Sequence, residues 1–148
     1  AVGRLGRSTE AALVRDYAER ATASGRALGL GPVEVIEVEA RKPGKAAEAE
    51  AILAKLDGAY LIACDEHGKA RASRDFAEMI GRLRDDGVRS LAVVVGGADG
   101  LDPAILSSAK DKLAFGPQTW PHALARVMLA EQVYRAVTIL AGGPYHRD

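Results

Sequence analysis

The stretch that constrains the fold most is LAFGPQTWPHALARVMLAEQVYRAVTILAGGPYHRD, residues 113–148. It combines a Gly-Pro loop, a long apolar helix pattern and an aromatic-basic segment. Chain ends usually fray into solvent, but here Tyr145, His146 and Arg147 directly follow the glycine-proline turn at residues 142–144. We therefore predict that this segment is held in place and forms half of an active site.

The helix pattern over residues 123–140 is apolar on nearly every side, because only Arg126, Glu131 and Arg135 are charged. A helix on the surface of a monomer shows a single apolar stripe. The additional apolar faces predict a contact with a second copy of the chain, and so a homodimer. Glu131 and Arg135 stand four residues apart in the order that favours an ion pair within one helix; a role between subunits or in the site is the open alternative.

The composition indicates one globular domain spanning residues 1–148, with 48% hydrophobic and 27% charged residues. There is no uncharged apolar run long enough for a membrane span and no signal segment, so we expect a cytoplasmic protein that contacts no membrane. Cys64 has no second cysteine to pair with, and the three histidines show no metal-ligand spacing, so no metal is expected. Only Ala1 and Val2 precede Gly3, so we expect an opening strand that is incompletely represented.

Apolar runs alternate with helical patterns along the whole chain, which is typical of an α/β fold. We expect a mostly parallel sheet with helices on both faces. The predicted strands cover residues 1–2, 33–38, 59–64, 91–95 and 113–115. The predicted helices cover residues 8–24 with Ser8 as the cap, 46–56, 73–86 with Ser73 as the cap, a short helix opened by Asp102 and Pro103, and 123–140.

Basic residues are concentrated in the loops that follow predicted strands, although the chain balances 20 basic against 20 acidic residues. In parallel sheets these loops meet at the carboxyl edge, where ligands bind. A cationic rim there would suit the phosphates of RNA, while ordinary solvated side chains are the alternative. The candidates for RNA contact in these loops are Arg4, Arg7, Lys42 and Lys45. Arg126 is a fifth candidate, for RNA or the subunit interface, with an ion pair at the edge of the core as its alternative.

Two glycine-containing loops, at residues 96–100 and 116–121, are predicted to adjoin at this edge and to form a pocket. Gly96 and Gly97 allow backbone to approach a ligand closely, although a tight turn explains them equally well. Neither loop has the glycine spacing of a dinucleotide fold or of a P-loop. No serine or cysteine nucleophile stands in a recognisable hydrolase context.

Four segments resemble the RlmH family, the ribosomal large-subunit RNA methyltransferases that methylate nitrogen 3 of a pseudouridine. They are Gly-Gly-x-x-Gly-Leu at 96–101, Phe-Gly-Pro-Gln-Thr-Trp-Pro-His at 115–122, Arg-Val-x-Leu-x-Glu-Gln-x-Tyr-Arg-Ala at 126–136 and Pro-Tyr-His-Arg at 144–147. The similarity also includes the segment Arg-Lys-Pro-Gly-Lys at 41–45 and covers essentially the whole chain.

The resemblance implies a SPOUT-class domain with a C-terminal trefoil knot, a homodimer, and S-adenosylmethionine as methyl donor. It places the donor in the knot, near Cys64, Gly96, Phe115, Gly116, Pro117, Gln118, Thr119 and Trp120. The chain departs from the family pattern at residues 98–99 and 116–118, which leaves side-chain contacts to the donor open. Buried apolar packing is the alternative for Cys64.

The reaction that the resemblance implies is methyl transfer from a sulfonium to a ring nitrogen that still holds a proton. His146 is a plausible acceptor for that proton. Arg147 would stabilise the resulting anion or hold a phosphate, and Tyr145 would stack on the base or hydrogen-bond to it. Orientation of the reactants alone is an alternative source of rate. A non-catalytic module that binds RNA or the ribosome is the alternative function, and either free RNA or the assembled ribosome could be the substrate.

Overall fold

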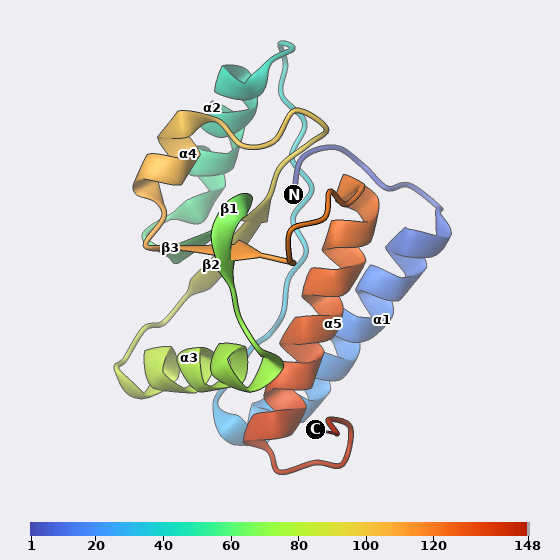
Figure 1. Ribbon diagram of the computed structural model, residues 1–148, viewed down its shortest axis with the longest axis vertical. Helices are drawn as coiled ribbons and strands as arrows, with labels where there is room; N and C mark the ends of the chain where they lie inside the picture. Colours follow the sequence, from blue (N-terminus) through green and yellow to red (C-terminus); the bar gives the residue numbers. More distant parts are fainter. Residues whose placement is uncertain (148) are drawn as a thin grey trace. The chain divides into compact units, whose positions relative to one another are not determined.

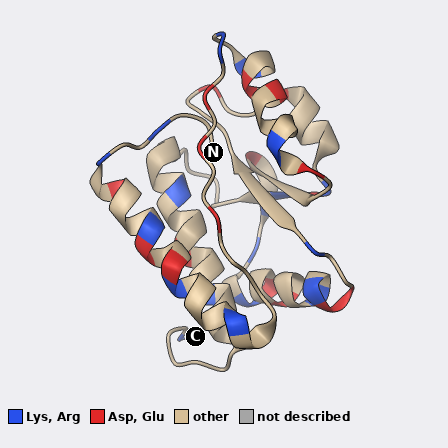
Figure 2. Cartoon of the chain, turned by 180° about the vertical axis from the view of Figure 1, so that it is seen from behind, with Lys and Arg blue, Asp and Glu red and all other residues tan. Residues whose placement is uncertain are grey.

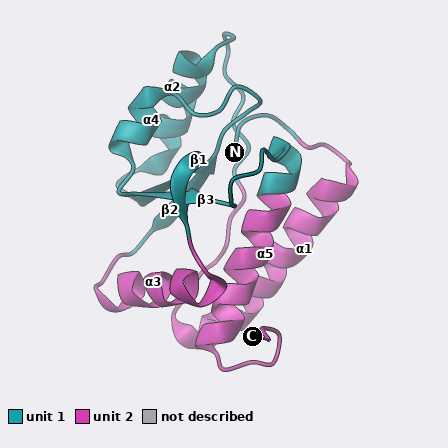
Figure 3. Ribbon diagram, viewed as in Figure 1, with its two compact units in different colours: residues 1–4, 36–70, 89–125 teal, residues 5–35, 71–88, 126–148 magenta. Residues whose placement is uncertain are grey.

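The computed structural model describes residues 1–147, which divide into two compact units (Figure 3). Unit 1 comprises Ala1–Arg4, Ile36–Ala70 and Arg89–Ala125. Unit 2 comprises Leu5–Val35, Arg71–Val88 and the chain from Arg126 onward. The chain passes repeatedly between the two, so neither unit is one continuous run of sequence.

Unit 1 contains a parallel sheet, which among the described residues has three strands in the order β2-β1-β3 (Figure 1). The strands are β1 (Tyr60–Ala70), β2 (Leu91–Val95) and β3 (Asp111–Ala114). Cys64 of β1 is in register with Val95 on one side and Leu113 on the other. The predicted α/β class, the parallel pairing and these three strands are therefore confirmed.

Strand β1 extends beyond its predicted end at residue 64 because of a bulge. Leu113 of β3 pairs with both Cys64 and Lys69, so residues 65–68 are extra on the β1 side. A Cβ atom on Gly68 would lie 2.8 Å from backbone atoms of Lys112 and Leu113. Only a glycine permits this approach of two backbones, and it lets β1 rejoin β3 after the bulge.

The two other predicted strands are reduced to one isolated bridge between Val2 and Val38. Val38 N–H donates to the Ala1 carbonyl at 2.8 Å, and Gly3 N–H donates to the Val38 carbonyl at 2.8 Å. Val2 N–H also donates to the Val95 carbonyl at 3.3 Å, which places this segment beside β2. Of the strand predicted over 33–38, only Val38 forms a bridge, and the Ile36 carbonyl accepts a hydrogen bond from the Ala1 nitrogen at 2.9 Å.

Two helices of unit 1, α2 (Lys45–Leu56) and α4 (Pro103–Ser108), pack against the same face of the sheet (Figure 1). Asp102 caps α4 by accepting a hydrogen bond from Ala104 N–H at 2.8 Å, and Pro103 follows at the first helical position, as predicted. The shared core consists of Val38, Ala49, Ile52, Leu61, Ala63, Val94, Leu101 and Ile105.

Unit 2 contains α1 (Thr9–Gly25), the short 3-10 helix η1 (Arg26–Leu28), α3 (Ser73–Asp85) and most of α5 (His122–Leu140). Ser8 caps α1 as predicted, and its hydroxyl accepts from Ala11 N–H at 3.1 Å. Ser73 does not cap α3, because Ala72 occupies the cap position and the Ser73 hydroxyl donates to Gln132 of α5 at 2.8 Å. No helix within residues 1–147 is both long and apolar enough to cross a membrane.

Candidate functional site

The two glycine-containing loops leave the sheet at its carboxyl edge. Gly96 directly follows β2 and Phe115 directly follows β3, while β1 runs between these two strands. Cys64 lies in the row of β1 that pairs with Val95 and Leu113, just before both loops begin. The loops therefore share the predicted edge, with the bulge of β1 between them.

The turn at residues 96–100 leaves no room for a side chain at Gly96. Its own Cβ would be 2.8 Å from the carbonyl carbon of Gly100 and 2.9 Å from the carbonyl oxygen. The turn is closed by a hydrogen bond from Gly100 N–H to the Gly97 carbonyl at 3.1 Å, and Gly100 has a positive φ of 77°. The tight turn that we weighed from the sequence is thus present, and the contact of Gly96 with a methyl donor stays a prediction.

The loop from Phe115 to Trp120 is closed by one of its own side chains. The indole N–H of Trp120 donates to the Phe115 carbonyl at 3.1 Å, and Gly116 allows the reversal with a φ of 90°. Phe115 and Gly116 are half-buried, whereas Pro117, Gln118, Thr119 and Trp120 are exposed. The loop therefore presents its backbone and an indole 39% exposed for contact with a ligand.

Cys64 is half-buried, and burial raises the pKa of its thiol to about 12. A thiol with so high a pKa stays protonated near neutral pH and is a poor nucleophile. Cys64 is therefore suited to apolar packing, and its place in the lining of a donor site stays a prediction.

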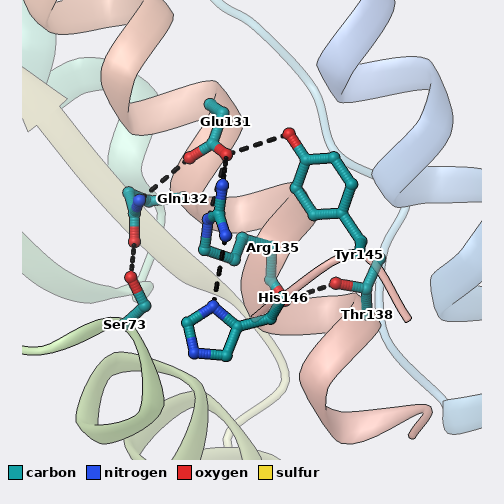
Figure 4. Close-up of polar contacts among 7 residues, drawn as sticks. All are labelled: Ser73, Glu131, Gln132, Arg135, Thr138, Tyr145 and His146. Carbon is teal, nitrogen blue, oxygen red and sulfur yellow. Dashed lines mark hydrogen bonds and ion pairs between the residues drawn. The ribbon is translucent and has the colours of Figure 1, made fainter. Parts of the chain in front are cut away.

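The second group of candidate residues forms a polar cluster in unit 2 (Figure 4). We call it the tail cluster, and it consists of Glu131, Gln132 and Arg135 of α5, Ser73 of α3, and Tyr145 and His146. Oε1 of Glu131 accepts hydrogen bonds from the Tyr145 hydroxyl at 3.0 Å and from Nε and Nη2 of Arg135. Its other oxygen accepts from Gln132, which in turn accepts from Ser73.

Tyr145 is held by its ring as well as by its hydroxyl. Its ring centroid is 4.7 Å from that of Tyr134, and the Arg135 guanidinium lies 4.8 Å from it. Burial, followed by the neighbouring Tyr17 and the Glu131 carboxylate, raises the pKa of Tyr145 well above its usual value. Tyr145 is therefore a neutral hydrogen-bond donor throughout the physiological range of pH. The predicted ordering of this segment is confirmed at this residue.

His146 is half-buried and lies with its Nδ1 atom 3.1 Å from Nη1 of Arg135. A guanidinium has donors and no acceptor, so Nδ1 must accept this hydrogen bond. To remove a proton from a substrate with the same nitrogen, His146 would have to release Arg135. The prediction that His146 is a proton acceptor is untested, and this contact constrains it.

The helical ion pair between Glu131 and Arg135 is present, as the first of our two readings predicted. The same pair also contacts Tyr145 and His146, so the alternative of a role in the site stays a prediction alongside the ion pair. The available signal was the motif at 126–136, which contains Glu131, Gln132 and Arg135 together and lies one short turn before the Pro-Tyr-His-Arg segment.

The candidates for RNA contact differ in accessibility. Arg4, Arg7, Lys42 and Lys45 are exposed, and Figure 2 shows basic positions in the loop that leads into α2. Arg4 pairs with Glu39 at 3.1 Å, an exposed ion pair of little energetic weight. Arg126 is only 4% exposed, so its assignment to RNA has no support from accessibility. Arg147 is exposed.

Comparisons with known proteins address the reaction class. The sequence matches the family described as "Predicted SPOUT methyltransferase" over residues 1–146. The chain belongs to the SPOUT methyltransferase family. It is therefore an enzyme that transfers methyl groups, and the α/β sheet described above agrees with this class.

Several relatives in this family are similar over their whole length, and each is named Ribosomal RNA large subunit methyltransferase H. The protein of Caulobacter sp. (strain K31) is 76% identical over 147 residues, covering 99% of this chain and 96% of the relative. That of Phenylobacterium zucineum (strain HLK1) is 74% identical over 148 residues, covering 100% and 96%. That of Roseobacter denitrificans is 51% identical over 150 residues, with the same coverage. Within residues 1–147, no cluster of side chains suited to a metal ion is present.

Proposed function

We propose that this protein transfers a methyl group from S-adenosylmethionine to nitrogen 3 of a pseudouridine in large-subunit (23S) ribosomal RNA. The observation that supports this most is the full-length similarity, up to 76% identity, to relatives named Ribosomal RNA large subunit methyltransferase H. The segments that the sequence analysis singled out, including the Pro-Tyr-His-Arg segment, lie within the matched region, which covers 99% of the chain.

The proposed donor site is the carboxyl edge of unit 1. Glycine turns let backbone amides and carbonyls contact the donor, while Cys64, Phe115 and Trp120 supply apolar lining. Gly96 and the backbone from Gly116 to Thr119 complete the set. When bound, S-adenosylmethionine supplies an electrophilic methyl group on a positively charged sulfur.

The proposed base-binding group is Tyr145, His146 and Arg147. Nitrogen 3 loses its proton, its electron pair forms the new N–C bond, and the S–C bond breaks to leave a neutral thioether. Tyr145 stacks on the base or donates to it, and the exposed Arg147 neutralises the anion or a neighbouring phosphate. The exposed cations Arg4, Arg7, Lys42 and Lys45 hold the RNA backbone.

The assembly that we propose is a cytoplasmic homodimer in which residues 1–148 act as one SPOUT-type domain with helices on both sheet faces and a trefoil knot. Support for the dimer comes from α5, where Leu124 is exposed and Val127, Met128 and Leu129 are only half-buried. Sedimentation equilibrium tests the dimer, and a monomer at micromolar concentration would contradict it. The assembled ribosome is the proposed substrate, because its shape can complete a site that is too small to read RNA alone.

The deciding experiment is mass-spectrometric mapping of 23S rRNA from cells with and without the gene. We expect one pseudouridine to lose a single methyl group in the deletion strain and to regain it on complementation. Purified enzyme should restore the methyl on deletion-strain ribosomes, and free 23S rRNA is the comparison substrate. An unchanged methylation map would refute the proposal.

Calorimetry with S-adenosylmethionine separates the enzyme from a non-catalytic RNA-binding module. We expect saturable binding by the purified protein. Ribosome binding without any donor binding would instead support the module.

A further inference from the structure

The contact between Arg135 and His146 affects where the imidazole ring lies and also which of its nitrogens carries the proton when the ring is neutral. We infer that Arg135, held by Glu131, orients His146 so that the imidazole donates a hydrogen bond to the target base and does not accept the proton that the base loses. This inference rests on the proposed function, in which His146 meets the base, and it assigns Glu131 and Arg135 as positioning residues.

Arg135 and His146 differ in which of their nitrogen atoms can accept a hydrogen bond. Nη1 of Arg135 lies 3.1 Å from Nδ1 of His146 and can only donate to it. A neutral imidazole whose Nδ1 accepts has its proton on Nε2. A doubly protonated ring would instead place an N–H group against the guanidinium. In the neutral ring, the contact with Arg135 therefore places the proton on Nε2.

Glu131 holds Arg135 in the orientation that makes this contact with His146. Its Nε and Nη2 atoms both bond to Oε1 of Glu131, which leaves Nη1 to face the histidine. The carboxylate raises the pKa of Arg135 further above its already high value, so the guanidinium keeps its charge. Glu131 also accepts from Tyr145, so one carboxylate oxygen holds two consecutive residues of the tail, one directly and one through Arg135.

A donor at this place suits the chemistry. When nitrogen 3 of a uracil ring loses its proton, the negative charge spreads onto the two neighbouring carbonyl oxygens. An N–H group aimed at one of those oxygens stabilises the anion, as the donors of an oxyanion hole do. The proton itself passes to solvent water, and the methyl transfer then proceeds with the balance of bonds given above.

Substitutions at His146 separate a donor from a proton acceptor. In glutamine the amide nitrogen takes the place of Nε2, whereas in asparagine it takes the place of Nδ1. With deletion-strain ribosomes and labelled S-adenosylmethionine, we expect His146→Gln to keep the single-turnover rate within about tenfold of wild type. His146→Ala and the matched control His146→Asn should lose about 100- to 1,000-fold, the usual effect of removing such a donor.

A double substitution tests the positioning role. Arg135→Lys should lower the single-turnover rate by about 100-fold through misplacement of the histidine, with an unchanged dissociation constant for S-adenosylmethionine. Because Arg135 acts through His146, the double variant Arg135→Lys/His146→Ala should be no slower than His146→Ala alone. Glu131→Gln should behave as Arg135→Lys does.

The outcomes are distinct. If His146→Gln is as slow as His146→Ala while both bind the donor with wild-type affinity, the donor role is wrong. If the two losses multiply in the double variant, Arg135 does not act through His146. If wild-type protein does not methylate the ribosomes at all, the proposed function fails instead. Urea denaturation of each variant shows that the rates compare folded proteins.

Discussion

At the scale of single residues, Gly96 and Gly97 differ in what a side chain would meet. A Cβ on Gly96 would press on backbone atoms of Gly100 at 2.8 and 2.9 Å, whereas one on Gly97 would be in ordinary contact with Val2 at 3.4 Å. We expect Gly96→Ala to lower the free energy of unfolding by about 1–3 kcal/mol and to weaken donor binding. Gly97→Ala is the matched control and should change both by little. Urea denaturation and calorimetry measure the pair, and equal losses would contradict the steric argument.

Cys64 offers a second test at this scale, because it is the single cysteine of the chain and burial raises its pKa from 9.0 to about 12. The native protein should react with iodoacetamide at pH 8 far more slowly than a free cysteine does, and denaturation should restore the normal rate. Equal rates before and after unfolding would show that the thiol is not held protonated.

The same shift gives a dependence of stability on pH. The folded pKa of Cys64 lies above the unfolded value, so its contribution is complete below pH 9 and is lost as the pH rises toward about 12. A Cys64→Ser variant, with no thiol to ionise, should lose less stability over that range.

Residue types alone identified part of the candidate site. The glycine loops and the aromatic-basic segment at 145–147 could be recognised in the sequence because such residues are unusual at those positions. The ordering of Tyr145 was also expected. For Glu131 and Arg135 a role in the site was only one of two open alternatives, because an ion pair four residues apart is ordinary in a helix. The three-dimensional contacts with Tyr145 and His146 show what the sequence could not, which is that the pair also holds that segment.

At the scale of elements, the cap of α1 is a direct test of a local prediction. Ser8 accepts a hydrogen bond from Ala11 N–H at 3.1 Å. We expect Ser8→Ala to lower the free energy of unfolding by about 1 kcal/mol, and Ser8→Asp to retain the cap. Ser24→Ala, at an exposed position near the end of the same helix, is the control and should be nearly neutral. Chemical denaturation that gave equal values for both alanine variants would contradict the cap.

The elements that could be predicted are those with strong local signals. Helices α1, α2, α3 and α5 and strand β2 begin and end close to their predicted limits, and α4 begins at Pro103 as predicted, because caps, prolines and glycines mark these elements. The run 33–38 has the composition of a strand, but pairing depends on a partner elsewhere in the chain, and the structure pairs it with Ala1–Gly3 through a single bridge. The bulge in β1 likewise depends on β3, so periodicity could not reveal it.

At the scale of the whole molecule, basic and acidic residues are equal in number but unevenly distributed along the chain. Lys42 and Lys45 are exposed at the start of α2, and Figure 2 shows acidic and basic residues alternating along helix α1. If the lysines bind phosphates, Lys42→Ala/Lys45→Ala should weaken ribosome binding and reduce the slope of log affinity against log salt by about 1 per lysine lost. Lys55→Ala, at the far end of α2, is the control for lost charge. An unchanged slope in the double variant would exclude these two residues from the RNA contact.

The position of Gly68 has a consequence for the tolerance of the fold to change. Most crowded sites accept a larger residue after a neighbouring side chain rotates, but here the obstructing atoms belong to the main chain of Lys112 and Leu113. No rotamer adjustment can make room. In a saturation library selected for folded protein, codon 68 should therefore be depleted of every other amino acid, alanine included.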